Sequence, residues 1–280
     1  MTPVLAALLA VLPADVSAGP RESLPAAKRW ACFYGREVSS EAWRSLDMVV
    51  LDPDNFQGAL ATGPVRLAYV SAGEADERRA FWPAVKGKPF LVEPNPEWPG
   101  AHRVDPRVKE WRELVAAQVS SALARGYDGV MFDTLDVAAH LESSSPARFA
   151  GAVQGAAELV LEVRRRNPGA VLVMNNGLAL LPFVSDAVDG LLVEDLYTNC
   201  MPGKEPCGPS AAGTTAGKEP PLERFRARGK PVFVLLYSRF SERRAKWVRR
   251  AAERSRAKGF LPYLTAPTLD RLGVVDPFSP

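Results

Sequence analysis

Acidic side chains follow five of the short apolar runs in this sequence, at the point where each run ends. They are Asp52 and Asp54 after residues 48–51, Glu74 and Asp76 after 65–70, Glu93 and Glu97 after 90–92, Asp133 and Asp136 after 129–132, and Glu194 and Asp195 after 190–193. Another run, 171–174, ends in Asn175, Asn176 and Gly177. Carboxyl groups that lie close together shift one another's pKa values, and general acid–base catalysis uses carboxyl groups with shifted pKa values. For Asp54, Asp76 and Asp195 the alternative role is a helix N-cap.

Aromatic side chains lie among these acids in the sequence. Tyr34, Trp98, Tyr197 and Tyr237 each stand at or just past the end of an apolar run. Carboxylates, amides and flat aromatic faces together suit a sugar ring, which has hydroxyl groups at its edge and C–H groups on its faces. We therefore expect a carbohydrate site, with these four aromatics and the acids Asp52, Glu74, Glu93 and Asp136 beside Asn175 and Asn176 as substrate-binding residues.

The elements that must position these residues are short strands and intervening helices. Runs of four to six apolar residues without alternation occur at 30–34, 48–51, 65–70, 89–92, 129–132, 171–174, 190–193 and 232–237. Such runs are typical of strands buried on both faces of a parallel sheet. Helical spacing, with start and stop signals, predicts helices after Asp105-Pro106, after Ser145-Pro146 and over residues 241–258.

Eight strands with interleaved helices predict an α/β fold of the (β/α)8 TIM-barrel type, with a single domain over residues 19–280. In such a barrel the carboxyl ends of all strands meet at one mouth, so the acids would converge there. A doubly wound sheet is the alternative, but no Gly-x-Gly-x-x-Gly follows the first strand. The stretch 198–220 is irregular and rich in Pro and Gly, and we expect an active-site loop there.

The composition excludes several classes of protein. The chain has 280 residues, 47% of them hydrophobic, with 35 basic and 32 acidic side chains. These values describe a globular protein and lack the clustered basic excess of a nucleic-acid-binding protein. The two histidines, His102 and His140, have no metal-ligand spacing, so no metal site and no cofactor are predicted.

The first 18 residues resemble a signal peptide. Residues 4–12 form an apolar run of nine residues, followed by Val16-Ser17-Ala18 as a cleavage site. The alternative is a buried N-terminal helix. We expect a secreted or periplasmic protein without a membrane span, and a monomer. Export permits disulfides, so Cys200 and Cys207 are a candidate pair, whereas Cys32 is predicted to be a buried free thiol.

Five segments resemble one known family. They are Tyr69-Val-Ser-Ala-Gly-Glu74, Glu93-Pro-Asn-Pro-Glu-Trp98, Tyr127-Asp-Gly-Val-Met-Phe-Asp133-Thr-Leu-Asp136, Asn175-Asn-Gly177 and Val193-Glu194, in this order. They are similar to the endo-α-1,4-polygalactosaminidases of glycoside hydrolase family 114, and the resemblance runs from about Trp30 to Leu264. It implies a (β/α) barrel that hydrolyses a galactosamine-rich polysaccharide.

The resemblance also implies a catalytic pair, which maps onto Asp133 and Glu194. It favours a retaining, endo-acting enzyme with Asp133 as the nucleophile and Glu194 as the acid/base, while Asp136 is the alternative partner of Asp133. The substrate would be an amino-sugar polymer, cationic where it is de-acetylated. Two other hypotheses remain. One is a carbohydrate-binding barrel with weak or lost activity. The other is a metal-dependent deacetylase, which the scarcity of histidines disfavours because its metal site would need them.

Overall fold

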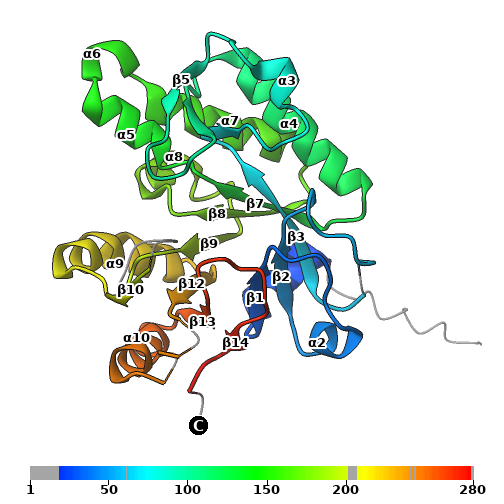
Figure 1. Ribbon diagram of the computed structural model, residues 1–280, viewed down its shortest axis with the longest axis vertical. Coiled ribbons are helices and arrows are strands. Elements are labelled where there is room, and N and C mark those ends of the chain that lie inside the picture. The colour runs from blue at the N-terminus through cyan, green and yellow to red at the C-terminus, as the bar shows by residue number, and fades with distance from the viewer. Residues whose placement is uncertain (1–18, 61, 201–206, 240, 243, 279–280) are drawn as a thin grey trace, which may run out of the picture.

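Eight parallel strands form a nearly closed barrel in the structure, a computed structural model that describes residues 19–60, 62–200, 207–239, 241–242 and 244–278 (Figure 1). Around the barrel, the strands in order are β1 (Trp30–Phe33), β2 (Met48–Leu51), β3 (Val65–Ser71), β7 (Gly129–Asp133), β8 (Val171–Asn175), β9 (Gly190–Val193), β12 (Val232–Tyr237) and β13 (Leu261–Thr265). The predicted barrel is thus confirmed. The predicted signal peptide, 1–18, lies outside the described residues.

The barrel is completed between β13 and β1 by side chains. The indole nitrogen of Trp30 donates to the Leu261 carbonyl at 2.9 Å, and the Trp30 ring lies 5.3 Å from that of Tyr263 and 5.2 Å from that of Phe233. A short antiparallel strand, β14 (Val274–Val275), pairs with β13. Large aromatic rings therefore fill the seam between β1 and β13, the first and last of the parallel strands.

One predicted barrel strand is wrong, and one barrel strand was not predicted. Residues 89–92 do not form a barrel strand, because β5 (Leu91–Pro94) pairs antiparallel with β6 (Ala101–Val104) in a separate sheet that also holds β4 (Glu74–Asp76). The eighth barrel strand is instead β13, which contains Pro262. Proline donates no ladder hydrogen bond, and its presence hides a strand from sequence patterns. The structure tolerates it at the barrel seam.

The helices cover the outside of the barrel (Figure 1). The long ones are α4 (Lys109–Ala124), α5 (Val137–Ser144), α7 (Ala152–Arg166), α9 (Ala212–Arg226) and α10 (Lys246–Ala257). Short ones are α1 (Pro20–Ser23), α2 (Ser40–Arg44), α3 (Trp82–Val85), α6 (Pro146–Phe149) and α8 (Leu181–Val184), with 3-10 turns η1 (Leu24–Ala26) and η2 (Leu178–Leu180). Their apolar faces pack on the sheet, and Trp111, Val115 and Val119 of α4 are fully buried.

Three predicted segments differ in detail. The helix expected after Ser145 is broken into α6 and α7 at Gly151, whose φ of +81° is a left-handed conformation that glycine adopts without strain. The helix expected to begin at Ser241 begins at Lys246. In the expected loop 198–220, short strands β10 (Thr198–Asn199) and β11 (Gly208–Pro209) pair with each other, and α9 follows.

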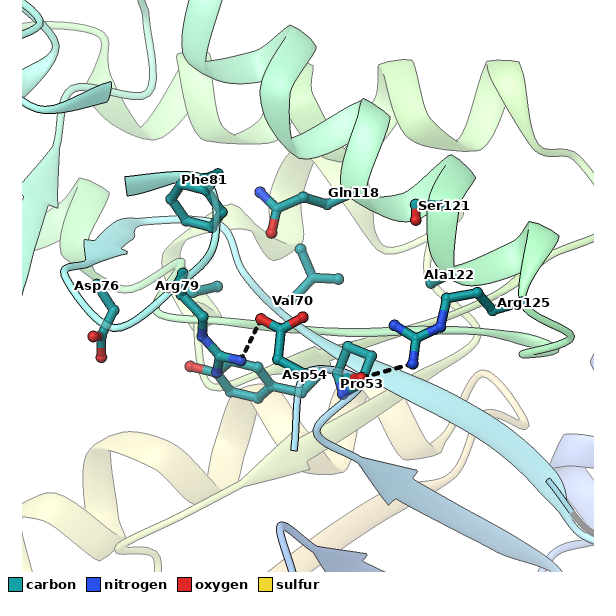
Figure 2. A pocket seen from close by; sticks show the side chains of 12 residues that line it. Pro53, Asp54, Val70, Asp76, Arg79, Phe81, Gln118, Ser121, Ala122 and Arg125 are labelled. Carbon is teal, nitrogen blue, oxygen red and sulfur yellow. Dashed lines mark hydrogen bonds and ion pairs between the residues drawn. The ribbon is translucent and has the colours of Figure 1, made fainter. Parts of the chain in front are cut away.

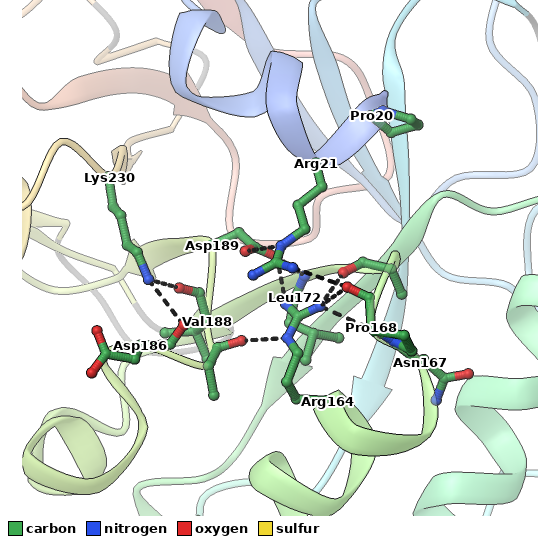
Figure 3. Close-up of polar contacts among 12 residues, drawn as sticks. Pro20, Arg21, Arg164, Asn167, Pro168, Leu172, Asp186, Val188, Asp189 and Lys230 are labelled. Atoms are coloured by element: carbon green, nitrogen blue, oxygen red, sulfur yellow. Dashed lines mark hydrogen bonds and ion pairs between the residues drawn. The ribbon is translucent and has the colours of Figure 1, made fainter. Parts of the chain in front are cut away.

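Aspartates at the amino end of the barrel fasten neighbouring strands. Asp47 accepts from the backbone N–H groups of Lys28 and Arg29, and Asp128 from that of Arg66. Asp189 accepts from the backbone of Leu172 at 2.9 Å. Each of these acids also pairs with arginine: Asp47 with Arg29, Asp128 with Arg66, and Asp189 with Arg21 and Arg164 (Figure 3). The amino end is therefore held by charge-paired acids.

Candidate active site

Three neighbouring strands bring Asp133, Asn175 and Glu194 together at the mouth, the end of the barrel where the strands finish. Asp133 ends β7, Asn175 ends β8, and Glu194 follows β9. The side-chain nitrogen of Asn175 donates to Asp133 Oδ1 at 2.8 Å and to Glu194 Oε1 at 2.6 Å. Those two carboxylate oxygens therefore lie no farther apart than the sum of the contacts, 5.4 Å.

Glu194 lies in a half-buried position that favours its protonated form. Burial, followed by the negative charge of Asp133, raises its pKa to about 7. The Tyr237 hydroxyl donates to Glu194 Oε2 at 2.7 Å, and this bond and the one from Asn175 oppose the rise. A carboxyl group poised near neutral pH can both give and accept a proton.

Tyrosines surround the other side of the carboxylate pair. Burial, and then the charge of Asp133, raise the pKa of Tyr69 well above its usual value. The Tyr34 ring meets the Tyr69 ring edge to face, with centroids 5.2 Å apart. The buried Cys32 thiol is free, as predicted, and burial raises its pKa. Asp133 therefore faces neutral phenols, which are able to donate to an ionised carboxylate.

A further acid, the buried Glu74, lies beside this pair. Its carboxylate accepts from the side-chain amide of Asn95 at 2.6 Å, and burial raises its pKa to about 7. The turn that carries it is fastened to the strand of Asp133, because Thr134 Oγ1 accepts from the Gly73 backbone at 2.8 Å and lies 2.9 Å from Ser71 Oγ. A side chain at Gly73 would collide with the Thr134 carbonyl, so glycine is required there.

Asp136 and Asp195 lie at the rim of the mouth. Asp136 precedes α5, and desolvation together with the charge of Asp133 raises its pKa. Desolvation also raises the pKa of Asp195, against the opposing charge of Lys218. Asp195 has a φ of +55°, and Lys218 of α9 donates to Asn176 Oδ1 at 3.1 Å. The mouth thus holds several acids in addition to the central pair.

Asp52, a predicted substrate-binding acid, pairs with the guanidinium of Arg79 in the structure. Arg79 donates to Asp52 at 2.7 Å and to Asp54 at 2.9 Å, and its guanidinium lies 5.2 Å from the centre of the Tyr69 ring. Arg79 and Asp54 line a cavity of about 100 Å³ beside the end of β3, and Figure 2 shows the contact between them. Asp52 therefore supports Tyr69 through Arg79.

The remaining predicted residues lie farther out or point elsewhere. Glu93 is exposed and bonds to Arg103 at 2.8 Å, and Trp98 is 44% exposed. Tyr197 is buried, and its hydroxyl donates to Glu219 of α9 at 2.7 Å, so the structure places it against that helix. It lies four residues past the end of β9, and its hydroxyl is not directed at Glu194.

Sequence reasoning did not single out Tyr69, Arg79, Asn95 or Lys218. Tyr69 stands two residues before the end of β3, within a segment that the family resemblance already contained. Lys218 belongs to the stretch read as an irregular loop, because Pro220 and Pro221 follow it and proline disfavours helix interiors. The predicted disulfide between Cys200 and Cys207 is present.

The described part of the chain shows neither a metal centre nor a membrane span. Within it, no group of three or more His, Cys, Asp and Glu side chains is arranged to hold a metal ion. No helix there is both long enough and apolar enough to cross a membrane.

The sequence pattern of glycoside-hydrolase family GH114 matches residues 13–277. The chain belongs to this family. It is therefore a glycosidase with a barrel fold. Among its relatives, an uncharacterized protein of Deinococcus radiodurans is 28% identical over 90% of this chain and 84% of its own length. One of Thermotoga maritima is 24% identical over 81% of this chain and 74% of its own length.

Two solved structures have the same fold as this GH114 protein. The glycoside hydrolase domain of PelA from Pseudomonas aeruginosa superposes with a TM-score of 0.77 at 22% identity, covering 89% of this chain and 98% of that domain. Ega3 of Aspergillus fumigatus, solved in complex with galactosamine, has a TM-score of 0.67 at 15% identity, covering 89% and 94%. At these identities the likeness shows the fold.

Proposed function

We propose that this GH114 protein is a secreted, endo-acting, retaining glycosidase that cleaves α-1,4-linked polysaccharide rich in galactosamine or N-acetylgalactosamine. Asp133 is the nucleophile and Glu194 the acid/base. The observation that carries the proposal is the Asn175 amide, which holds oxygens of the two carboxyl groups within 5.4 Å of each other. Retaining glycosidases separate their two carboxyl groups by about 5–5.5 Å, and inverting ones by about 6.5–9.5 Å.

The reaction has two steps. In the first, a carboxylate oxygen of Asp133 bonds to the anomeric carbon while Glu194 gives its proton to the departing glycosidic oxygen. In the second, Glu194 takes a proton from water, and that water displaces Asp133 from the sugar. The configuration is retained because the anomeric carbon is inverted twice. Asn175 and Tyr237 hold Glu194 in place between the steps.

The surroundings of the two acids support this division of roles. Glu194 keeps a pKa of about 7 through burial and the Asp133 charge, so it holds a transferable proton near neutral pH. Asp133 accepts a hydrogen bond from Asn175 and faces the phenol of Tyr69, so its carboxylate is held in a fixed position for attack on the anomeric carbon.

The acids around the pair support an amino-sugar substrate. Glu74, Asp136 and Asp195 lie at the mouth, and Ega3, which shares the fold, was solved with galactosamine. De-acetylated galactosamine carries an ammonium, which such a mouth attracts more strongly at low ionic strength. The exposed face of Trp98 is suited to stacking against a sugar unit beyond the central one.

Two features support secretion. Residues 4–12 form the apolar run of a signal peptide. The Cys200–Cys207 disulfide is of a kind that persists in oxidising compartments and is rare in the reducing cytosol.

The test is an assay of the purified protein on α-1,4-linked galactosamine polymer, in fully acetylated and partly de-acetylated forms. We expect new reducing ends within the chain, faster release from the de-acetylated polymer, and slower release as salt is added. Proton NMR of the first product should show the α-anomer, as retention requires. Release of the β-anomer would overturn the retaining mechanism, and equal or faster cleavage of the acetylated polymer would overturn the charge preference.

A further inference from the structure

Helix α9 forms hydrogen bonds with the chain segment that carries Glu194. Thr215, Lys218 and Glu219 stand three and four residues apart, so they share one face of the helix. The Lys218 ammonium donates to the Glu194 carbonyl at 2.7 Å, Thr215 Oγ1 donates to the Leu196 carbonyl at 2.6 Å, and Glu219 accepts from the Tyr197 hydroxyl at 2.7 Å. Three contacts from one helix face thus fix the four residues that follow β9.

Lys218 alone of these three also reaches a second loop. Its ammonium donates to Asn176 Oδ1 at 3.1 Å, and Asn176 is the residue next to Asn175. Asn175 in turn donates to both Asp133 and Glu194. One cation therefore ties the loop of the bridging amide to the loop of the acid/base.

Both loops have backbone conformations that need such support. Asn176 has a φ of +49° and Asp195 a φ of +55°, in the left-handed region that residues with a side chain adopt at a cost in free energy. These conformations persist where surrounding contacts determine them. The Lys218 contacts lie at Asn176 itself and at the carbonyl directly before Asp195.

Several charges face Lys218 at the mouth. They are Asp195 and Glu194 after β9 and Asp136 before α5, and Glu97 in turn lies near Asp195. Burial lowers the pKa of Lys218, and these acids oppose that change. Helix α9 is in turn fixed to α10, because Arg254 bonds to Glu219 at 2.7 Å and Lys258 pairs with Glu223. Lys218 therefore extends from a supported helix.

We propose that Lys218 is a positioning residue that holds Glu194 and the Asn175–Asn176 loop in the arrangement needed for proton transfer, and so makes α9 part of the active site. The proposal rests on the proposed role of Glu194. In this proposal α9 does more than cover the barrel. Its Lys218 ammonium contacts a backbone carbonyl on one loop and a side-chain amide on another.

The test compares Lys218→Met and Lys218→Arg with wild type on the galactosamine polymer. Lys218→Met removes the ammonium but keeps an unbranched side chain, and we expect kcat to fall about 10–100-fold with KM nearly unchanged. The alkaline limb of the pH profile should move to higher pH, because a cation near Glu194 is lost. Lys218→Arg should restore the pH profile and part of the rate. Lys258→Met is the matched control, since it removes an exposed lysine that follows α10 and pairs with Glu223 of α9, and it should change neither kcat nor the pH profile.

A second measurement separates this proposal from the proposed function. Carbon NMR titration of the glutamate carboxyls reports the Glu194 pKa without any substrate, and Lys218→Met should raise it by half a unit or more. If wild type cleaves no polymer, the proposed function fails while the titration still decides the role of Lys218. A kcat within twofold of wild type with an unchanged titration would overturn the positioning role. Should Lys218→Met not fold, Lys218→Gln supplies the same two readouts.

Discussion

Asp189 at the amino end of the barrel and Glu194 at the mouth are held by different kinds of partner. At the amino end, Asp189 accepts from Arg21 at 2.7 Å and from Arg164 at 2.6 Å, and Lys230 donates nearby to the Val188 carbonyl (Figure 3). At the mouth, Glu194 is held by Asn175 and Tyr237, which are neutral donors. Asp189 therefore has cationic partners, whereas the side-chain hydrogen bonds to Glu194 come from uncharged groups.

The difference shows how the fold separates stability from chemistry. A buried carboxylate paired with arginine makes charge-assisted hydrogen bonds, and at Asp189 these fasten neighbouring strands. A buried carboxylate that receives only neutral hydrogen bonds, next to another acid, keeps its proton to higher pH. The raised pKa of Glu194 and Glu74, each to about 7, belongs to the second kind.

The largest expected effect is the loss of activity at the mouth. Asp133→Asn and Glu194→Gln are nearly isosteric, so each should fold normally while turnover falls by about 10³-fold or more, since nucleophile or acid catalysis is lost. Initial rates on the polymer, with circular dichroism as the folding control, measure this. A folded variant that keeps more than about a tenth of the wild-type rate would contradict the assigned role.

The corresponding change at the amino end should affect stability alone. Asp189→Asn leaves Arg21 and Arg164 without their acid, and we expect a loss of about 2–3 kcal/mol, seen as a fall in Tm of roughly 5–10 °C. The rate per folded molecule should match wild type. Asp186→Asn is the control, because Asp186 pairs with Arg228 but has a side chain that is 93% exposed, and its Tm should hardly move. A lower kcat in Asp189→Asn would contradict the assignment of stability to the amino end and of catalysis to the mouth.

Replacement of Glu194 should also stabilise the protein at alkaline pH. Its pKa in the folded state is about 7, above the ordinary 4.5, so folding favours the protonated form. This contribution is full below pH 4.5 and is lost as pH rises from about 4.5 to about 7. The glutamine of Glu194→Gln cannot ionise. We therefore expect the free energy of unfolding of this variant to exceed that of wild type by about 1–3 kcal/mol at pH 8 and to equal it near pH 4. Denaturant unfolding at both pH values measures it, and a gain at pH 4 as large as that at pH 8 would contradict the charge explanation.

The smallest expected effect is the pH dependence of the rate itself. Glu194 must carry its proton to act as the acid, so kcat/KM should fall about tenfold for each pH unit above about 7. Asp189→Asn should show the same profile, since it leaves the mouth unchanged. A flat profile from pH 6 to 9 would indicate that another group supplies the proton.

Much of the fold and of the central site could be predicted from local sequence. Continuous apolar runs such as 48–51 and 232–237 became barrel strands with the same bounds, because burial on both faces leaves no polar alternation. Asp133, Asn175 and Glu194 stand at strand ends, where a parallel barrel must bring them together. Pro262 hid β13, and Pro220 and Pro221 hid α9, because packing overrode local propensity in both segments.

The sequence by itself determined which residue types reach the barrel mouth, since the period of burial and the strand ends are local properties of the chain. Only the tertiary structure decided which partners each acid has. Asp52 lies 27 positions from Arg79, and Asp189 lies 168 from Arg21, yet both acids are paired with those cations, whereas Glu194 meets Asn175 and Tyr237. The pKa of a carboxyl depends on burial and on the charges within a few ångströms, and both arise when distant segments pack together.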